Sequence, residues 1–300
     1  MKRLEEKIAE LKVKRNAVIL AHNYVAGEVQ DVADFVGDSL ELSIKAQNAG
    51  APVIVFCGVS FMAETAKILS PASTVLHPDP SAGCPMADMV TDEAVRAYRR
   101  THPDTVIVAY VNTTAAVKAE VDICCTSGNA ERIIRSIPKD KHILFLPDQN
   151  LGANISRMTG REMELWPGYC PTHHQIQPEA ALRIREQYPD AVMLVHPECM
   201  PAVVALADEA LSTGGMLGYV QKSDAKSFII GTECGILHRL RKENPEKTFI
   251  SLEPVPTCPD MKKISLERIV DSLTFMQYEV VLDAELMDRA RLPIEQMLAV

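Results

Sequence analysis

The sequence predicts an α/β fold made of three similar units, each with a parallel sheet covered by helices on both faces. Uninterrupted apolar runs alternate with stretches of helical periodicity along the 300 residues. Such runs are typical of parallel strands that are buried on both faces. Similar phrases also return at intervals of 86 to 88 residues, and a fixed period of self-similarity indicates a repeat architecture.

The elements of the three units follow from these runs. In the first unit we expect helices at 2–15, 39–49 and 61–70 and strands at 17–22, 53–58 and 74–77. In the second we expect helices at 91–100 and 129–136 and strands at 105–111, 120–125 and 142–147. In the third we expect helices at 178–187 and 233–243 and strands at 191–196, 227–231 and 248–252. Residues 266–300 are expected to be helical and to fold back on the first unit.

Polar side chains recur in the same phase of each unit. One set consists of Asp34, Asp122 and Asp208, and a second set consists of pairs that follow the first strand of each unit: His22 and Tyr24, Tyr110 and Asn112, His196 and Glu198. Residues i and i+2 point to the same side of a strand, and ligands bind beyond the carboxyl ends of parallel strands. Threefold packing would bring the pairs to one cavity. The alternative is that they are hydrogen-bonded polar groups of the core.

Three Cys-Pro steps, at Cys84, Cys170 and Cys258, lie 86 and 88 residues apart. Thiols so distant in sequence meet only if three units bring them to one axis. Structural zinc usually has four protein ligands, so three thiols in phase favour an iron–sulfur cluster with one open iron. The alternative is that they are small buried residues. That alternative is preferred for the other five cysteines, Cys57, Cys124, Cys125, Cys199 and Cys234.

A hydroxyl group precedes a helical stretch in each unit, at Ser39, Ser127 and Thr213. Such residues cap helices, and the first turn of a helix also attracts carboxylate or phosphate groups. The pattern therefore predicts either plain caps or three donors to a multiply anionic substrate. No glycine-rich nucleotide loop is present.

Composition excludes several classes of protein. The chain is 47% hydrophobic with a formal charge of −9, and it has no basic cluster of the kind that nucleic-acid binding needs. No apolar run reaches the length of a membrane span, and the first residues have no signal-peptide core. We expect a cytoplasmic protein with reduced thiols and with no nucleic-acid or membrane partner.

Several phrases together resemble one family. They are Ala21-His22-Asn23-Tyr24, 33–39 (ADFVGDS), Gly83-Cys84-Pro85-Met86, Tyr110-Val111-Asn112, Cys170-Pro171-Thr172-His173, His196-Pro197-Glu198-Cys199 and Ser212-Thr213-Gly214. The chain is similar over essentially its whole length to the quinolinate synthases. The resemblance implies three αβα domains around a pseudo-threefold axis with a central active site, which we place at 1–83 with 259–300, at 84–170 and at 171–258.

The resemblance also implies a reaction and its residues. It implies a [4Fe-4S] cluster held by Cys84, Cys170 and Cys258, and condensation of iminoaspartate with dihydroxyacetone phosphate to quinolinate, phosphate and water. It implies a functional link to the enzyme that makes iminoaspartate. The expected catalytic residues are Glu198, Tyr24 and His196. The expected substrate-binding residues are His22, Ser39, Tyr110, Val111, Asn112, Ser127, His173, His196, Pro197, Glu198 and Thr213.

Two other functions remain open from the residues themselves. One is a zinc hydrolase that uses a thiolate-bound metal with His196 and Glu198. The other is an iron–sulfur binding or sensing module without catalysis, although such a module would not need three sets of proton-transfer and anion-binding residues.

Overall fold

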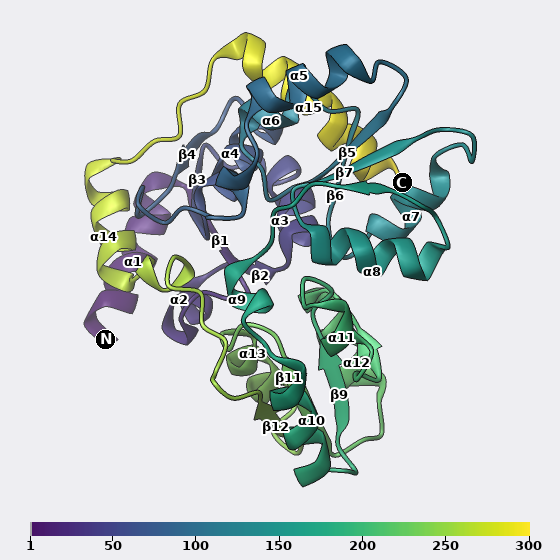
Figure 1. The fold of residues 1–300 in the computed structure, drawn as a ribbon. Coiled ribbons are helices and arrows are strands. Elements are labelled where there is room, and N and C mark those ends of the chain that lie inside the picture. Colours follow the sequence, from purple (N-terminus) through teal and green to yellow (C-terminus); the bar gives the residue numbers. More distant parts are fainter. Residues whose placement is uncertain (1) are drawn as a thin grey trace.

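The computed structural model describes residues 2–300, and over these residues the chain forms three parallel sheets of four strands each (Figure 1). The strand order is the same in every sheet: the second strand of the unit lies at one edge, followed by the first, third and fourth. The predicted α/β class with three similar units is therefore confirmed. The domain boundaries given above stay a prediction.

The first unit contains β1 (Ala17–His22), β2 (Phe35–Gly37), β3 (Val53–Cys57) and β4 (Thr74–Leu76). Its helices are α1 (Lys2–Arg15), α2 (Gly27–Val32), α3 (Ser39–Gln47) and α4 (Ser60–Leu69). All five side chains of β3 are buried. Helix α3 begins where it does because the Asp38 carboxylate accepts the amides of Leu40 and Glu41.

The second unit contains β5 (Val106–Tyr110), β6 (Ile123–Cys125), β7 (Ile143–Leu146) and β8 (Glu164–Leu165). Its helices are η1 (Ala87–Met89), α5 (Asp92–Thr101), α6 (Ala115–Lys118), α7 (Ala130–Ser136) and α8 (Gln149–Thr159). The short strand β8 and the helix α8 are not among the elements expected from the sequence. Helix α8 packs against β7 and β8 and touches α11 (Pro201–Val204) of the third unit.

The third unit contains β9 (Val192–Val195), β10 (Glu209–Ala210), β11 (Ser227–Gly231) and β12 (Thr248–Ser251). Its other helices are α9 (Pro171–His174), α10 (Pro178–Gln187), α12 (Thr213–Lys222) and α13 (Ile236–Glu243). The three sheets surround the middle of the molecule, with the third unit set apart from the other two (Figure 1).

The C-terminal residues do not all return to the first unit. After η2 (Met261–Lys263), helix α14 (Leu266–Phe275) packs on α1, as expected. Helix α15 (Ala284–Ala299) instead packs chiefly on α6 and β6 of the second unit, as Figure 1 shows, and also touches α4. Its apolar stripe, Ala290, Ile294 and Met297, is fully buried there. The expectation for 266–300 is thus wrong for the last helix, because an apolar stripe indicates that a helix is buried but not where.

The repeated aspartates make one contact three times. Asp34 accepts the amide of Ile19 at 2.8 Å, Asp122 that of Ile107 at 2.7 Å and Asp208 that of Met193 at 2.8 Å. Each carboxylate also pairs with a basic residue from the helix before the sheet, namely Lys12, Arg99 and Arg185. The set therefore fixes the start of each second strand against the first strand.

No helix among residues 2–300 is long and apolar enough to cross a membrane.

Candidate active site

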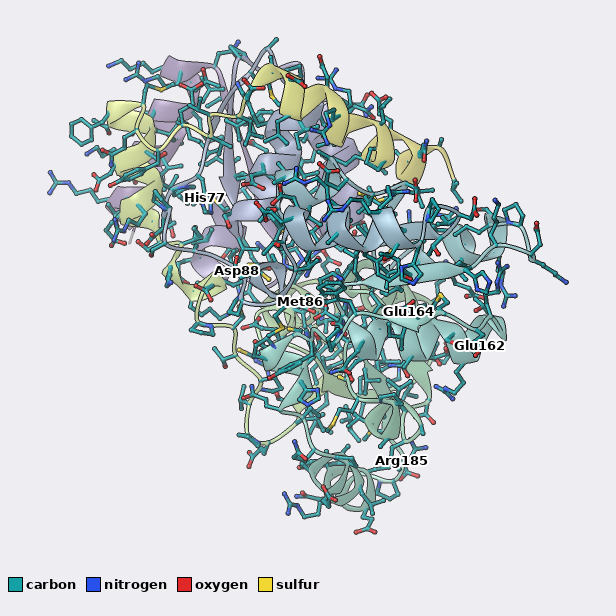
Figure 2. The ribbon with its side chains drawn as sticks, turned by 45° about the horizontal axis from the view of Figure 1, so that its top comes forward. His77, Met86, Asp88, Glu162, Glu164 and Arg185 are labelled. Atoms are coloured by element: carbon teal, nitrogen blue, oxygen red, sulfur yellow. The ribbon has the colours of Figure 1, made fainter. Side chains whose placement is uncertain are left out.

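A cavity of about 140 Å³ lies where the carboxyl ends of the three sheets face one another. Side chains from all three units line it. Met86 is on its wall and lies near the middle of the molecule, whereas Arg185, on α10, lies far out at the periphery (Figure 2). The sequence-predicted residues on the wall are His22, Tyr24, Ser39, Cys84, Tyr110, Asn112, Ser127, Cys170, His173, His196, Glu198, Thr213 and Cys258.

The three Cys-Pro thiols share one local structure. Each follows the fourth strand of a sheet and stands one to three residues before a short helical segment, η1, α9 or η2. Backbone amides where η1 and η2 begin face the sulfur atoms: those of Met86 and Ala87 for Cys84, and those of Asp260 and Met261 for Cys258. Pro171 is the first residue of α9, a position that suits proline because the first residue of a helix needs no donor.

The thiols suit a bound metal group. Burial raises the pKa of Cys84 to about 12, and burial also raises the pKa values of Cys170 and Cys258. Their thiolates are therefore stable at neutral pH only with a cation, and metal binding would release the protons. Amides directed at sulfur are the contacts that stabilise metal-bound thiolates. Three such thiols on one wall fit a cluster that leaves one iron without a protein ligand.

Two histidines hold the same tautomer through the same contact. The amide of Tyr24 donates to Nδ1 of His22 at 3.2 Å, and the amide of Glu198 donates to Nδ1 of His196 at 3.3 Å. Burial lowers the pKa of His22 to about 4 and that of His196 to about 3. Both rings are thus neutral at pH 7 and carry their proton on Nε2, where it can be donated into the cavity. His196 Nε2 already lies 3.2 Å from Ser127 Oγ.

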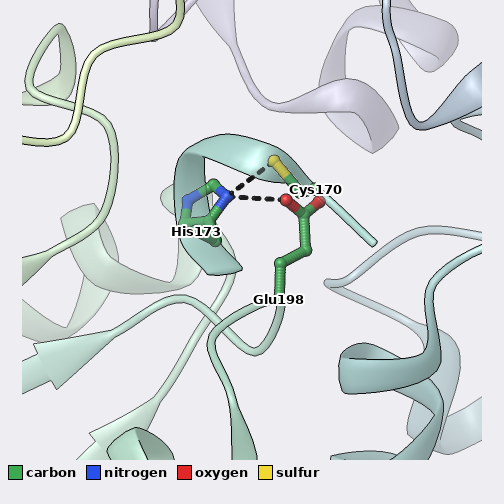
Figure 3. Close-up of side chains that lie close together, drawn as sticks. All are labelled: Cys170, His173 and Glu198. Carbon is green, nitrogen blue, oxygen red and sulfur yellow. Dashed lines mark hydrogen bonds and ion pairs between the residues drawn. The ribbon is translucent and has the colours of Figure 1, made fainter. Parts of the chain in front are cut away.

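Glu198 belongs to a polar cluster with His173 and Cys170, in which His173 lies between the other two (Figure 3). Its Oε2 lies 2.7 Å from His173 Nδ1, which is also 3.2 Å from Cys170 Sγ. The Tyr110 hydroxyl donates to Oε1 at 2.5 Å. Burial acts to raise the pKa of Glu198, but His196, His173 and these hydrogen bonds outweigh it and hold the pKa below its usual range. Glu198 is therefore a carboxylate that can accept a proton.

Tyr24 lies on the other side of His173. Its hydroxyl is 2.5 Å from Thr232 Oγ1, which is itself 2.8 Å from His173 Nε2. Burial and then the charge of Glu198 raise the pKa of Tyr24 well above its ordinary value. The phenol therefore stays protonated and can donate a proton or a hydrogen bond.

The remaining polar groups on the wall are suited to an anionic ligand. An exception is Asn112 Oδ1, an acceptor that is buried without a hydrogen-bond partner in the protein and would suit a hydroxyl or N–H group of a ligand. Ser39 and Thr213 are the first residues of α3 and α12, and Ser127 stands three residues before α7. The described wall contains no Lys or Arg, so neutral N–H and O–H donors would have to hold any carboxylate or phosphate.

Two predicted substrate-binding residues are not on the wall. Val111 and Pro197 lie behind it, where their carbonyl groups accept from Lys118 Nζ at 2.7 Å and from Asn154 Nδ2 at 2.9 Å. Of the five cysteines expected to be core residues, Cys57, Cys124, Cys125 and Cys199 are fully buried, whereas Cys234 is partly exposed.

Several residues that line the cavity were not among the predicted site residues, among them Asp38, Phe61, Met62 and Glu233. Asp38 also joins two units, because its Oδ2 accepts the Ser212 hydroxyl at 3.0 Å. Its position directly before the predicted helix at 39–49 was the signal that could have identified it. Glu233 follows the predicted strand 227–231 and could have been found in the same way.

The fold and the cavity define the class: an α/β protein of three repeated units around a central pocket with three thiols. The sequence model of one family, described as quinolinate synthetase A protein, matches residues 6–299. The chain therefore belongs to that family.

Curated relatives agree with this assignment. The chain is 52% identical over 297 residues to the quinolinate synthase of Dehalococcoides mccartyi strain CBDB1, which covers 99% of this chain and 98% of the relative. It is 50% identical over 297 residues to the quinolinate synthases of Geobacter metallireducens and Methanosarcina barkeri, with 99% of this chain and 97% of each relative covered.

Proposed function

We propose that this protein is a quinolinate synthase that condenses iminoaspartate with dihydroxyacetone phosphate, giving quinolinate, phosphate and water. The observation that carries the proposal is the meeting of Cys84, Cys170 and Cys258 on the wall of one small cavity with proton-transfer residues. Membership of the family supports the same function.

The three thiols are proposed to hold a [4Fe-4S] cluster. When bound, such a cluster supplies an open iron that acts as a Lewis acid for the loss of water. The amides behind Cys84 and Cys258 support this assignment, because they would stabilise thiolates that burial otherwise disfavours.

The substrates are both anionic, and the wall offers neutral donors for them. The Nε2–H groups of His22 and His196 and the hydroxyls of Ser39, Ser127 and Thr213 are proposed to bind carboxylate and phosphate oxygens. Neutral imidazoles suit this task because the site also contains the Glu198 carboxylate, which would compete with the substrate for a cationic ring. The unpartnered Oδ1 of Asn112 would accept from a hydroxyl or N–H group of a substrate.

Proton transfer is proposed for Glu198, Tyr24 and His196. Glu198 is held as a carboxylate and would accept a proton. Tyr24 is held as a phenol and would return one. The hydrogen bonds from His173 and Tyr110 fix the orientation of Glu198 before a substrate arrives. We further propose that the protein works in the cytoplasm and depends on an enzyme that supplies iminoaspartate.

The proposal is tested by adding both substrates to anaerobically prepared, cluster-loaded protein and measuring quinolinate by mass spectrometry. Quinolinate should form only when both substrates are present, and protein stripped of its cluster should form none. Absence of quinolinate from cluster-loaded protein overturns the proposal.

One observation favours a second candidate, a zinc hydrolase. The ligand atoms of Cys170, His173 and Glu198 lie within 4.8 Å of one another, a set that a single ion could use. In this function Cys84 and Cys258 would lie on the wall but would not bind the metal ion. It predicts about one zinc per chain and no labile sulfide.

A further inference from the structure

Glu233 is a buried acid on the cavity wall to which the proposed chemistry gives no role. It stands two residues after β11, and its side chain is 0% exposed. A carboxylate at this depth costs several kcal/mol unless it is paired and hydrogen-bonded. The hydrogen bonds and the ion pair that Glu233 makes therefore indicate its role.

Glu233 binds the backbone of the third thiol. Its Oε1 accepts the amide of Cys258 at 3.1 Å, and its Oε2 accepts the amide of Gly235 at 2.6 Å. The two oxygens thus join the end of β11 to the loop that carries Cys258.

Lys262 extends this contact to the first unit. Its Nζ lies 2.8 Å from Glu233 Oε1 and donates to the carbonyl oxygen of Tyr24 at 2.5 Å. Lys262 belongs to η2, the helical turn that follows Cys258. One ion pair, fully buried on the Glu233 side and partly exposed on the Lys262 side, therefore holds the Cys258 turn on one side and the backbone of Tyr24 on the other.

We propose that Glu233 is a positioning residue, which fixes the Cys258 turn and, through Lys262, the backbone of Tyr24, so that the third thiol and the tyrosine keep a set distance. This inference rests on the proposed function, because it takes Cys258 as a cluster ligand. Partners of this kind orient metal ligands, and their loss typically lowers metal affinity or activity about 10- to 100-fold.

The second unit contains a related arrangement. Asp148 follows β7 as Glu233 follows β11, and it is also fully buried. Burial and then Glu198 raise the pKa of Asp148, while the amide of Cys170 is among the groups that act to lower it. In the first unit, the residue in the corresponding place after β3 is the apolar Val59, and the next amide, that of Ser60, donates to the Ala82 carbonyl. Buried acids therefore stand behind Cys170 and Cys258, the thiols of the second and third units.

A purely structural role for Glu233 makes a different prediction from a positioning role. A structural role would lower the stability of the metal-free protein and leave the loaded cluster unchanged. A positioning role would change the cluster itself. Glu233→Gln also leaves the Lys262 cation without its partner, which should move the reduction potential of the cluster in the positive direction because net charge near a cluster tunes it.

The experiment compares anaerobically reconstituted wild type, Glu233→Gln and a control, Asp208→Asn. Asp208 also accepts a backbone amide and pairs with a basic residue, but on the outside of the third unit. Three properties are measured: the rate of iron loss to a chelator, the electron paramagnetic resonance spectrum of the reduced cluster, and its potential. We expect Glu233→Gln to lose iron about 10-fold faster or more, with a changed spectrum and a raised potential. The control should match wild type.

Wild-type values for all three properties in a folded Glu233→Gln variant overturn this inference but leave the proposed function standing. A wild type that binds no cluster overturns both. If Glu233→Gln does not fold, Lys262→Met decides the question, because it keeps the bond from the Cys258 amide to Glu233 and removes the link to Tyr24 together with the Lys262–Glu233 ion pair. It should retain iron but lose at least about 10-fold in kcat, and an unchanged kcat contradicts the inference.

Discussion

Two sets of polar residues occupy matching phases of the repeat, yet the structure uses them differently. Asp34, Asp122 and Asp208 are the same residue type and make the same contact in each unit, and none of them lines the cavity. The strand-end residues His22, Tyr110 and His196 are not all of one type, and they meet on one wall. Of these two sets, the one that is identical in every unit holds the fold, and the one that varies between units contributes to the site.

The difference has a physical reason. Each sheet needs its own hydrogen bond where its second strand begins, so three copies of one aspartate serve three sheets. The cavity is a single space that all units share, and one substrate complex needs different groups around it. Glu198 and Tyr24 show this most clearly, because they share a phase but burial and their neighbours give one a low and the other a high pKa.

The largest effect is expected from removal of a thiol of the shared site. Cys84→Ala should lose its cluster and at least about 10³-fold in turnover, because it removes one of the three proposed protein ligands. Iron content and quinolinate formation measure this. The matched control is Cys57→Ala, a buried thiol of the same unit that is absent from the wall. It should keep its cluster and cost about 1 kcal/mol of stability. A normal cluster in Cys84→Ala contradicts the ligand assignment.

Replacement of the carboxylate should have the next largest effect. Glu198→Gln keeps an oxygen that can accept from Tyr110 but cannot take up a proton. Turnover should fall about 10²- to 10⁴-fold, while the spectrum of the cluster still responds to added substrate. Steady-state assays and spectral titration separate these two outcomes. Turnover equal to wild type would remove Glu198 from the proton-transfer steps.

The buried histidines should make the protein sensitive to acid. Their folded-state pKa values, about 4 for His22 and about 3 for His196, lie below the unfolded value near 6.5, so the unfolded chain binds more protons in this window. Stability should be fully present above pH 6.5 and fall as the pH approaches 4, by about 2.5 kcal/mol for each ring at pH 4.5. Urea unfolding of metal-free protein at a series of pH values measures this. His22→Gln should reduce the slope of the unfolding free energy against pH. An identical slope in His22→Gln contradicts the assignment.

The smallest effect is expected in the identical set. Asp208→Asn weakens one bond to the Met193 amide and one half-exposed pair with Arg185. It should cost about 1 kcal/mol of stability and leave kcat and KM unchanged. Thermal unfolding and steady-state assays test this together. A large loss of turnover with a normal melting temperature would contradict the conclusion that the aspartates stabilise the fold and take no part in the site.

Much of the fold could be predicted because parallel strands buried on both faces leave uninterrupted apolar runs. Helix α8 was not predicted because polar residues interrupt the apolar periodicity of its buried face. One of them is Asn154, which donates to the carbonyls of Pro197 and Cys199. The two-residue strand β8 lies at a sheet edge and is too short to show alternation. The strand-end residues could be predicted because their phase repeats. The position of Glu233 after a predicted strand was visible in the sequence, but its role could not be predicted, since that role depends on Lys262 and Tyr24, which only the folded chain brings to it.

The central claim is that thiols from three repeated units hold one cluster at the shared cavity. Its most direct test is the count of iron, zinc and acid-labile sulfide in protein purified without oxygen. The account predicts about four iron and about four sulfide per chain with little zinc. About one zinc per chain without sulfide would contradict it.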